Sequence, residues 1–214
     1  MTRSPSFCGL ILAAGESSRM GRDKALLPWP PPVSGEANRA GETFLSAAIR
    51  SLLPFCDLVL VVAGANVSRL APVVYMSNAS LVTNPAPERG QFSSLQVGLQ
   101  EVLNHGRDAA IITLVDRPPA RASTLATLRE AFQAAPSNIW ATVPEYQGKH
   151  GHPFIAGREL TNAFIKAPPT ANAREIEQQH HSHIQYVPVT DSTVTLNIDT
   201  PEAYSALQAE PAST

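Results

Sequence analysis

Residues 8–24 read CGLILAAGESSRMGRDK, an apolar run that passes into a loop of small and cationic residues. The run Cys8–Ala14 is short and almost wholly apolar, which is typical of a strand buried on both faces of a parallel sheet. The loop after it carries Arg19 and Lys24. Small residues let backbone N–H groups approach phosphate oxygens, and cations offset phosphate charge. The stretch therefore predicts a buried strand followed by a polyphosphate-binding loop.

This loop does not follow two common phosphate-binding patterns. The spacing G-x-x-x-x-G-K-[S/T] is absent, and so is the dinucleotide pattern G-x-G-x-x-G. Ser17 and Ser18 add hydroxyl donors to the loop. The alternative is a turn of small residues whose cations are merely solvated, and the spacing alone leaves it open.

The rest of the chain alternates buried strands with amphipathic helices. The expected strands are Leu58–Ala63, Ala109–Val115, Ile139–Val143, Pro153–Ala156 and Ile184–Val189, and the expected helices are Phe44–Leu53, Ser94–Leu103, Thr124–Phe132, Arg158–Ile165 and Ala173–Gln179. Such alternation predicts an α/β fold, a Rossmann-like three-layer sandwich with a mixed, mostly parallel sheet.

Composition limits the class of protein. The 214 residues suit a single domain spanning 1–214, and 43% hydrophobic with 16% charged residues fit a folded chain. A net charge of −2 argues against binding to nucleic acid or to an anionic membrane, because both need a surplus of Lys and Arg. Residues 30–42 are rich in Pro, Gly and polar residues, so they predict an exposed flexible loop.

The cysteines and the apolar runs indicate the compartment. Cys8 and Cys56 sit beside apolar runs, and two thiols are too few for a disulfide framework or a four-ligand zinc site. Both are expected to be buried and reduced. Because the first seven residues contain no signal-peptide core and no run approaches about 20 apolar residues, we expect a cytoplasmic protein.

Two carboxylates are candidates for binding a metal ion. Asp116 follows the predicted strand Ala109–Val115, and ligands of open α/β sheets bind beyond the carboxyl ends of the strands. Carboxylate oxygen suits Mg²⁺, although a turn Asp before Pro is the alternative. Asp199 is the second candidate, and the Thr200-Pro201 pair after it also predicts a helix start.

Two further groups have weaker signals. Asn84 and Ser94 follow a short apolar stub and precede a helix, where hydroxyls and free N–H groups can read a base or bind an anion, although capping is the alternative for Ser94. His152 lies in a glycine-punctuated turn, where a structural role is the alternative. The group His180, His181 and His183 has no acidic or Cys partner and is not expected to bind zinc.

The order of these motifs resembles the nucleotidyltransferases of molybdenum-cofactor maturation, and more closely their cytidylyltransferase branch. The matching segments are L-A-A-G-x-S-x-R-M-G-x-x-K at Leu12–Lys24, G-x-x-S-S-L-x-x-G-L at Gly90–Leu99, D-x-P at Asp116–Pro118, G-x-x-G-H-P at Gly148–Pro153 and I-D-T-P-E at Ile198–Glu202. They cover nearly the whole chain in the family's order.

The resemblance implies a nucleotide-diphospho-sugar-transferase-like fold and Mg²⁺-dependent transfer of a nucleoside monophosphate to a phosphorylated acceptor, with release of pyrophosphate. The implied roles are nucleotide contact for Leu12, Ala13, Ala14 and Gly15, phosphate contact for Arg19 and Lys24, base or ribose contact for Asn84 and Ser94, metal binding for Asp116 and Asp199, and acceptor contact for His152 and Asp199. The implied catalytic residues are Lys24, Arg19 and Asp116.

Three positions refine this reading. Ala14 stands where guanylyl-transferring relatives typically carry Gly, which favours CTP over another nucleoside triphosphate. Arg117 replaces the usual Gln or Met and either contacts an unusual acceptor or points to solvent. Asn197 replaces the first carboxylate of the late motif, which leaves one or two metal ions open.

The implied partners are CTP, a molybdopterin-type acceptor, and a client molybdoenzyme or its chaperone. Two alternatives stay open: transfer to another phosphorylated acceptor such as a sugar phosphate, and a non-catalytic or redox-adapted relative that only binds a nucleotide or a flavin-like ring.

Overall fold

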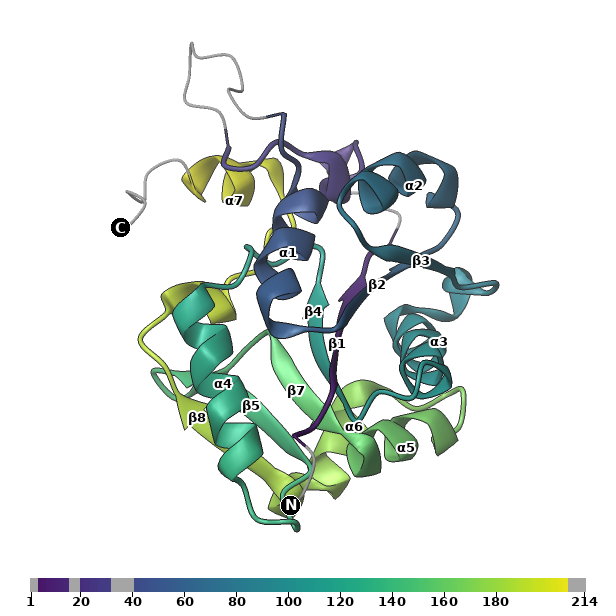
Figure 1. Ribbon diagram of the computed structural model, residues 1–214. Coiled ribbons are helices and arrows are strands. Elements are labelled where there is room, and N and C mark those ends of the chain that lie inside the picture. The colour runs from purple at the N-terminus through teal and green to yellow at the C-terminus, as the bar shows by residue number, and fades with distance from the viewer. Residues whose placement is uncertain (1–3, 16–19, 32–40, 208–214) are drawn as a thin grey trace.

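The computed structural model describes residues 4–15, 20–31 and 41–207. These residues form one eight-stranded sheet in the order β3-β2-β1-β4-β7-β5-β6, with β8 paired to β5 (Figure 1). The strands are β1 Phe7–Leu12, β2 Leu58–Ala63, β3 Ser80–Thr83, β4 Ala109–Leu114, β5 Ala141–Tyr146, β6 Lys149–His150, β7 Phe154–Gly157 and β8 Ile184–Pro188.

The sheet is mixed and mostly parallel, as the alternation predicts. Strand β1 pairs in parallel with β2 and β4, and β2 pairs in parallel with β3. Strand β7 is antiparallel to β4 and β5, and β8 is parallel to β5. The carboxyl ends of β1, β2 and β4 therefore meet at one edge of the sheet.

Helices cover both faces, which confirms the three-layer architecture. One face packs on α1 (Phe44–Leu52), α2 (Val67–Met76) and α4 (Ala122–Ala134), and the other on α3 (Gln91–Asn104), α5 (Arg158–Lys166) and α6 (Ala173–Gln179). Short 3₁₀ helices occur at η2 Lys24–Leu26, η3 Leu53–Phe55, η4 Pro87–Arg89, η5 His181–His183 and η6 Ser192–Thr195. Helix α7 (Pro201–Ala206) lies beside α1 at the upper end in Figure 1.

Strand β1 is the centre of the core. Its alternate residues enter opposite layers: Ile11 packs with α1 and α4, and Leu10 packs with α3. Both side chains are fully buried. Helix α3 lies so close to the sheet that a Cβ on Gly98 would be 2.6 Å from Leu10 Cδ1. The apolar run in the sequence thus reflects burial on two faces.

Two elements and one cysteine differ from the sequence expectation. Helix α2 is absent from it, because Pro72 within Val67–Met76 interrupts the usual helical signal. The two-residue strand β6 lies in a segment expected to be a turn. Cys56 is only half-buried, which corrects the expectation for that thiol, whereas Cys8 is fully buried. Burial raises the pKa of Cys8 to about 12 and also raises the pKa of Cys56.

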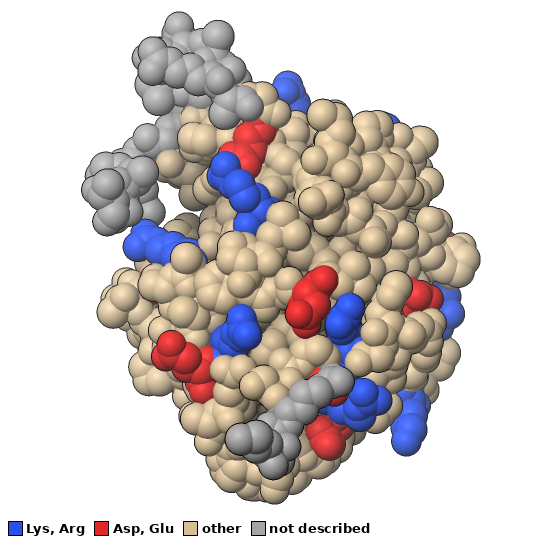
Figure 2. Space-filling view, viewed as in Figure 1, with Lys and Arg blue, Asp and Glu red and all other residues tan. Residues whose placement is uncertain are grey.

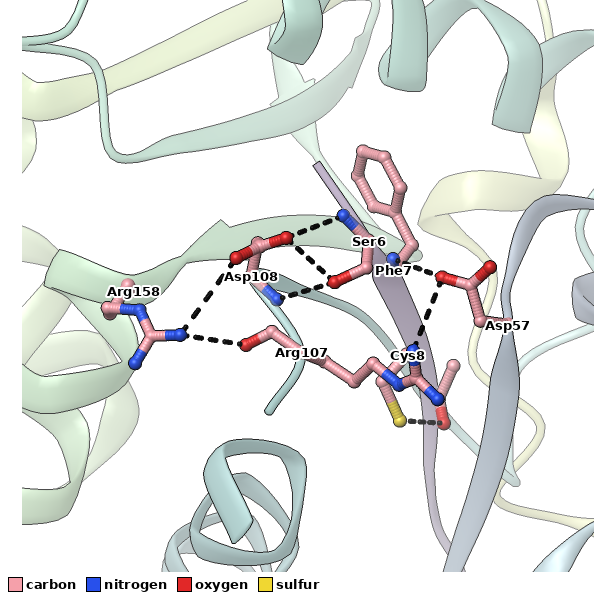
Figure 3. A network of polar contacts seen from close by, with 8 residues as sticks. Ser6, Phe7, Cys8, Asp57, Arg107, Asp108 and Arg158 are labelled. Carbon is pink, nitrogen blue, oxygen red and sulfur yellow. Dashed lines mark hydrogen bonds and ion pairs between the residues drawn. The ribbon is translucent and has the colours of Figure 1, made fainter. Parts of the chain in front are cut away.

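The amino end of β1 is closed by a polar network. Asp108 accepts hydrogen bonds from the Ser6 backbone N–H (2.8 Å) and hydroxyl (2.7 Å), and Asp57 accepts one from the Phe7 N–H (3.1 Å), as Figure 3 shows. Arg107 lies 3.9 Å from Asp57. This network fixes where the sheet begins, at the end opposite the carboxyl ends of the strands.

The surface matches the small net charge. Figure 2 shows positive and negative side chains interspersed on the face it presents. No helix within the described residues has the length and apolarity to cross a membrane.

Candidate active site

A cavity of about 490 Å³ opens at the carboxyl ends of β1, β2 and β4, against the start of α3. Its walls come from the loop after β1, the turn after β2, the segment before α3 and the end of β4. The lining residues are Leu12, Ala14, Gly15, Lys24, Ala65, Pro87, Glu88, Gly90, Gln91, Ser94, Val115 and Asp116. This is the crevice where open α/β sheets bind ligands.

The Asn66 side-chain amide joins the two sides of the loop after β1. The Asn66 Nδ2 donates to the Ala13 carbonyl and to Asp23 Oδ2, both at 2.9 Å, and its Oδ1 accepts from the Gly64 N–H at 3.1 Å. Both Asn66 and Asp23 are buried. The loop's entry and exit are therefore fixed to the turn after β2.

Lys24 is the residue after Asp23, so the same contacts position it. Asp23 caps η2 by accepting from the Ala25 N–H, so the backbone at Lys24 has a fixed direction. The Lys24 ammonium lies 2.6 Å from Asp199 Oδ1 and 3.9 Å from Asp116 Oδ2. One cation thus meets the two carboxylates singled out in the sequence.

Asp116 has a feature that fits a metal ligand. Its Oδ1 is buried and has no hydrogen-bond partner among the described residues. Burial raises the pKa of this carboxyl, against the opposing effects of Lys24 and Arg117. A divalent cation on that oxygen would relieve the cost of burying it. The described residues contain no cluster of three His, Cys, Asp or Glu side chains for a metal, but Mg²⁺ needs only one or two carboxylates beside substrate phosphates.

Residues 191–200, here called the strap, bring Asp199 to this place. The strap begins at Asp191, a buried carboxylate that accepts hydrogen bonds from the Thr124 hydroxyl of α4 (2.9 Å) and from Thr193. The Val194 carbonyl then accepts from the His152 N–H at 2.9 Å. The strap is therefore fastened to α4 and to the turn before β7.

The second half of the strap is fastened to the end of β4. Arg117 Nη1 donates to the Leu196 carbonyl at 2.8 Å, and the Ile198 N–H donates to the Asp116 carbonyl at 2.8 Å. Arg117 therefore neither points to solvent nor lines the cavity. Its guanidinium is bonded to the strap, a contact that was not expected from the sequence.

The strap ends at α7, as the sequence predicts. Thr200 caps this helix by accepting from the Ala203 N–H, and Pro201 lies in its first turn. The Tyr204 hydroxyl donates to the Pro28 carbonyl at 2.6 Å. Asn197 donates to Asp199 Oδ2, so the residue that replaces the usual carboxylate orients the one that remains.

Asn84, for which the resemblance implies contact with the base or ribose, is held in a network of hydrogen bonds. It is buried, and its Nδ2 donates to the hydroxyls of Ser93 and Ser94 at 2.9 Å, while its Oδ1 accepts from the Ala86 N–H. Asn84 does not line the cavity, whereas Ser94 does. It shapes the turn that presents Ser94, because all of its polar atoms are used within the turn.

His152 also lies outside the cavity lining. Its Nδ1 is buried without a partner among the described residues, and its ring packs edge-on against Phe154. Burial, with Arg117 nearby, lowers its pKa to about 3, so the ring is neutral at physiological pH. The preceding Gly151 cannot carry a side chain, because a Cβ there would be 2.1 Å from the Val194 carbonyl oxygen.

The structure thus brings part of the implied set together. Leu12, Ala14, Gly15, Lys24, Ser94 and Asp116 line the cavity, and Asp199 contacts Lys24. Ala13 lies beneath the loop with its carbonyl bound to Asn66. Arg19 lies outside the described residues, as do 32–40 of the expected loop.

Three polar residues of the site were not singled out from the sequence. Glu88 and Gln91 line the cavity, and Asn66 anchors the loop. Asn66 follows the carboxyl end of β2 by three positions, the same signal that identified Asp116. Glu88 lies in η4 and Gln91 begins α3. The path of the chain between them depends on Gly90, with φ at +92°, and no pattern of spacing reveals it.

The fold and the site together define a nucleotidyltransferase with a nucleotide-diphospho-sugar-transferase-like sheet. The sequence model described as MobA-like NTP transferase domain matches residues 9–184. The chain belongs to this family.

Three curated relatives illustrate its range. The chain is 27% identical over 198 residues to the molybdenum cofactor cytidylyltransferase of Escherichia coli, covering 91% of this chain and 92% of the relative. It is 31% identical over 135 residues to a probable molybdenum cofactor guanylyltransferase of Rhodopirellula baltica, 63% and 60% of the two chains. It is also 25% identical to the nicotine blue oxidoreductase of Paenarthrobacter nicotinovorans, covering 94% and 96%.

A solved structure supports the same fold. The crystal structure of Rv0371c from Mycobacterium tuberculosis superposes with a TM-score of 0.74 at 25% identity, covering 96% of this chain and 98% of that one.

Proposed function

We propose that this chain transfers CMP from CTP to the phosphate of molybdopterin, in the presence of Mg²⁺ and with release of pyrophosphate. The observation that carries the proposal is the meeting of Lys24, Asp116 and Asp199 at the mouth of the cavity after β1. These residues come from segments up to 175 positions apart, yet they gather where the nucleotide phosphates would lie.

CTP is the proposed nucleotide because Ala14 lines the cavity at the position where guanylyl-transferring relatives typically carry Gly. The similarity to the cytidylyltransferase of Escherichia coli covers nearly the whole of both chains, which supports the same choice. GTP is the competing nucleotide.

The chain's own residues bind and orient the reactants. Backbone N–H groups around Gly15 and the Lys24 ammonium hold the triphosphate, and Asp116 with Asp199 would hold Mg²⁺. When bound, Mg²⁺ neutralises charge on the phosphate oxygens. An acceptor phosphate monoester has its second pKa near 6, so its attacking oxygen is mostly ionised at neutral pH and no side-chain base is required. The oxygen attacks the α-phosphorus and pyrophosphate leaves.

Pyrophosphate release, measured with CTP, GTP, ATP and UTP and with or without molybdopterin, tests the proposal. We expect release with CTP and molybdopterin together. Asp116→Asn should lower the rate by about 10²–10³, the usual loss for one preorganised electrostatic group. Glu130→Gln, an exposed change on α4, is the matched control and should leave the rate unchanged. Full activity of Asp116→Asn would remove the metal role from this residue.

The same assay separates the two alternatives. Release with CTP and a sugar phosphate, but not with molybdopterin, would assign another phosphorylated acceptor. CTP binding without turnover on any acceptor would favour the non-catalytic or redox-adapted reading, for which the oxidoreductase relative is a precedent. A client molybdoenzyme or its chaperone is the proposed receiver of the product.

A further inference from the structure

Lys24 lies where a cation is needed even when no nucleotide is bound. Its ammonium is 2.6 Å from Asp199 Oδ1 and 3.9 Å from Asp116 Oδ2. The Lys24 side chain is 13% exposed, and those of Asp116 and Asp199 are 26% and 30% exposed. Solvent therefore screens this group only partly, and the two carboxylates need a positive charge between them.

The acceptor atoms of Asp199 are already in use. Oδ1 accepts from Lys24 and Oδ2 accepts from Asn197. A divalent cation that binds both carboxylates would lie close to the Lys24 ammonium, and repulsion between the two cations would move Lys24 away from Asp199. The Asp116 Oδ1, which has no partner among the described residues, is the oxygen that such an ion can reach without displacing a donor.

Lys24 can move its charge without moving the loop. Its backbone is fixed by the Asp23 cap and by the Asn66 amide that joins Asp23 to Ala13. The four-carbon stem is flexible, and the ammonium is a compact point charge without a fixed bonding plane. The side chain can therefore turn from Asp199 into the cavity that it lines.

We propose that Lys24 is an internal stand-in for the metal ion, which keeps a divalent cation off Asp199 until a nucleoside triphosphate draws the ammonium onto its phosphates. This inference rests on the proposed function, because it uses the same metal and nucleotide. Metal and nucleotide then bind as a coupled pair. Since coupling is reciprocal, each raises the affinity for the other by the same factor.

Mn²⁺ titration followed by electron paramagnetic resonance, without nucleotide, tests the inference. We expect Lys24→Met, which keeps an unbranched side chain and removes its charge, to bind Mn²⁺ on the order of 10-fold more tightly than the wild type. Lys24→Gln should act in the same direction, which guards against a folding defect in one variant. Lys166→Met, at an exposed position on α5, is the matched control.

The dependence on Asp199 and on nucleotide completes the test. Adding Asp199→Asn to Lys24→Met should abolish the gain. CTP, after correction for Mn²⁺ bound by free CTP, should tighten Mn²⁺ binding in the wild type and do so less in Lys24→Met. Equal or weaker Mn²⁺ binding by both Lys24 variants, in the absence of nucleotide, overturns the inference alone. No Mn²⁺ binding by the wild type with CTP present overturns the metal assignment of the proposed function, and the inference with it.

Discussion

At the scale of single residues, Asp116 and Arg117 show what a motif does and does not disclose. Asp116 follows a buried strand, so its position in the crevice could be predicted from the sequence alone. Arg117 is its neighbour, yet its partner is the Leu196 carbonyl, 79 positions further along the chain. No local pattern contains that partner. The role of Arg117 in fastening the strap became visible only with the tertiary structure.

The negative charge of Asp116 should lower the free energy of unfolding of the protein. Its pKa is raised in the folded protein, chiefly by burial, so ionisation of this carboxyl disfavours the folded state at neutral pH. Asp116→Asn removes that charge and leaves Lys24 paired with Asp199. We expect its melting temperature at pH 7 to exceed that of the wild type by a few degrees, where about 2–4 °C corresponds to roughly 1 kcal/mol for a chain of this size.

The pH dependence identifies the cause of that gain. As the pH falls through the raised pKa of Asp116, the wild-type carboxyl becomes neutral as well, so the difference between the two melting temperatures should shrink. Differential scanning fluorimetry across pH measures it. A gain that stays constant down to acid pH would assign the effect to packing instead of charge.

At the scale of elements, the strap joins parts of the fold that the sequence leaves unrelated. Strands β1, β2 and β4 and helix α6 were predictable almost to the residue, because each has a strong apolar period or run of its own. The strap has no such period. Its course is set by Asp191, by the Val194 and Leu196 carbonyls and by the Ile198 N–H, which bond to residues on other elements. Therefore Asp116 was predictable as a site residue, and its contact with Lys24 and Asp199 was not.

Two glycine variants should separate the strap from the core. In Gly151→Ala the new Cβ would lie 2.1 Å from the Val194 backbone oxygen, so the strap itself must move. In Gly98→Ala the clashes are with core side chains, Leu10 Cδ1 at 2.6 Å and Val62 Cγ2 at 2.8 Å, so the core must repack while the strap is not touched. We expect both variants to lose about 1–3 kcal/mol of unfolding free energy.

Only the strap variant should also impair the site. Gly151→Ala is expected to raise the KM for the nucleotide several-fold, whereas Gly98→Ala should leave KM unchanged, in steady-state assays at a temperature where both variants are folded by circular dichroism. An unchanged KM in Gly151→Ala would show that the position of Asp199 does not depend on this contact.

At the scale of the whole molecule, the carboxylates at the two ends of the sheet differ in their hydrogen bonding. The amino end is closed by the Ser6, Asp57 and Asp108 network (Figure 3), which pairs its carboxylates with backbone and hydroxyl donors. The carboxyl end contains a buried carboxylate oxygen and a buried imidazole nitrogen without partners among the described residues. The carboxylates of the amino end are therefore paired with donors, whereas Asp116 at the carboxyl end has a buried oxygen without a donor among the described residues, as expected of a protein that binds ligands at this edge of its sheet.

His152 should make the global stability sensitive to acid. Its pKa is about 3 in the folded protein against 6.5 for an unperturbed ring, so the unfolded chain binds the proton more readily. Proton binding therefore leaves the free energy of unfolding unchanged above pH 6.5, and lowers it as the pH falls from 6.5 to about 3. Within that window one proton changes stability by about 1.4 kcal/mol per pH unit. His152→Gln should show a correspondingly shallower decline in urea unfolding at pH 4–6.5, and an identical slope would refute the buried neutral ring.

The 175 positions between Lys24 and Asp199 also matter during translation. Lys24 leaves the ribosome long before the strap exists, so the growing chain carries a loop whose ammonium has not yet met that carboxylate. The strands of the first half can pair earlier, because β1, β2 and β3 are consecutive in the chain and adjacent in the sheet. The site is therefore completed late in synthesis, and a nascent chain that ends before the strap would lack both Asp199 and the anchor of Arg117.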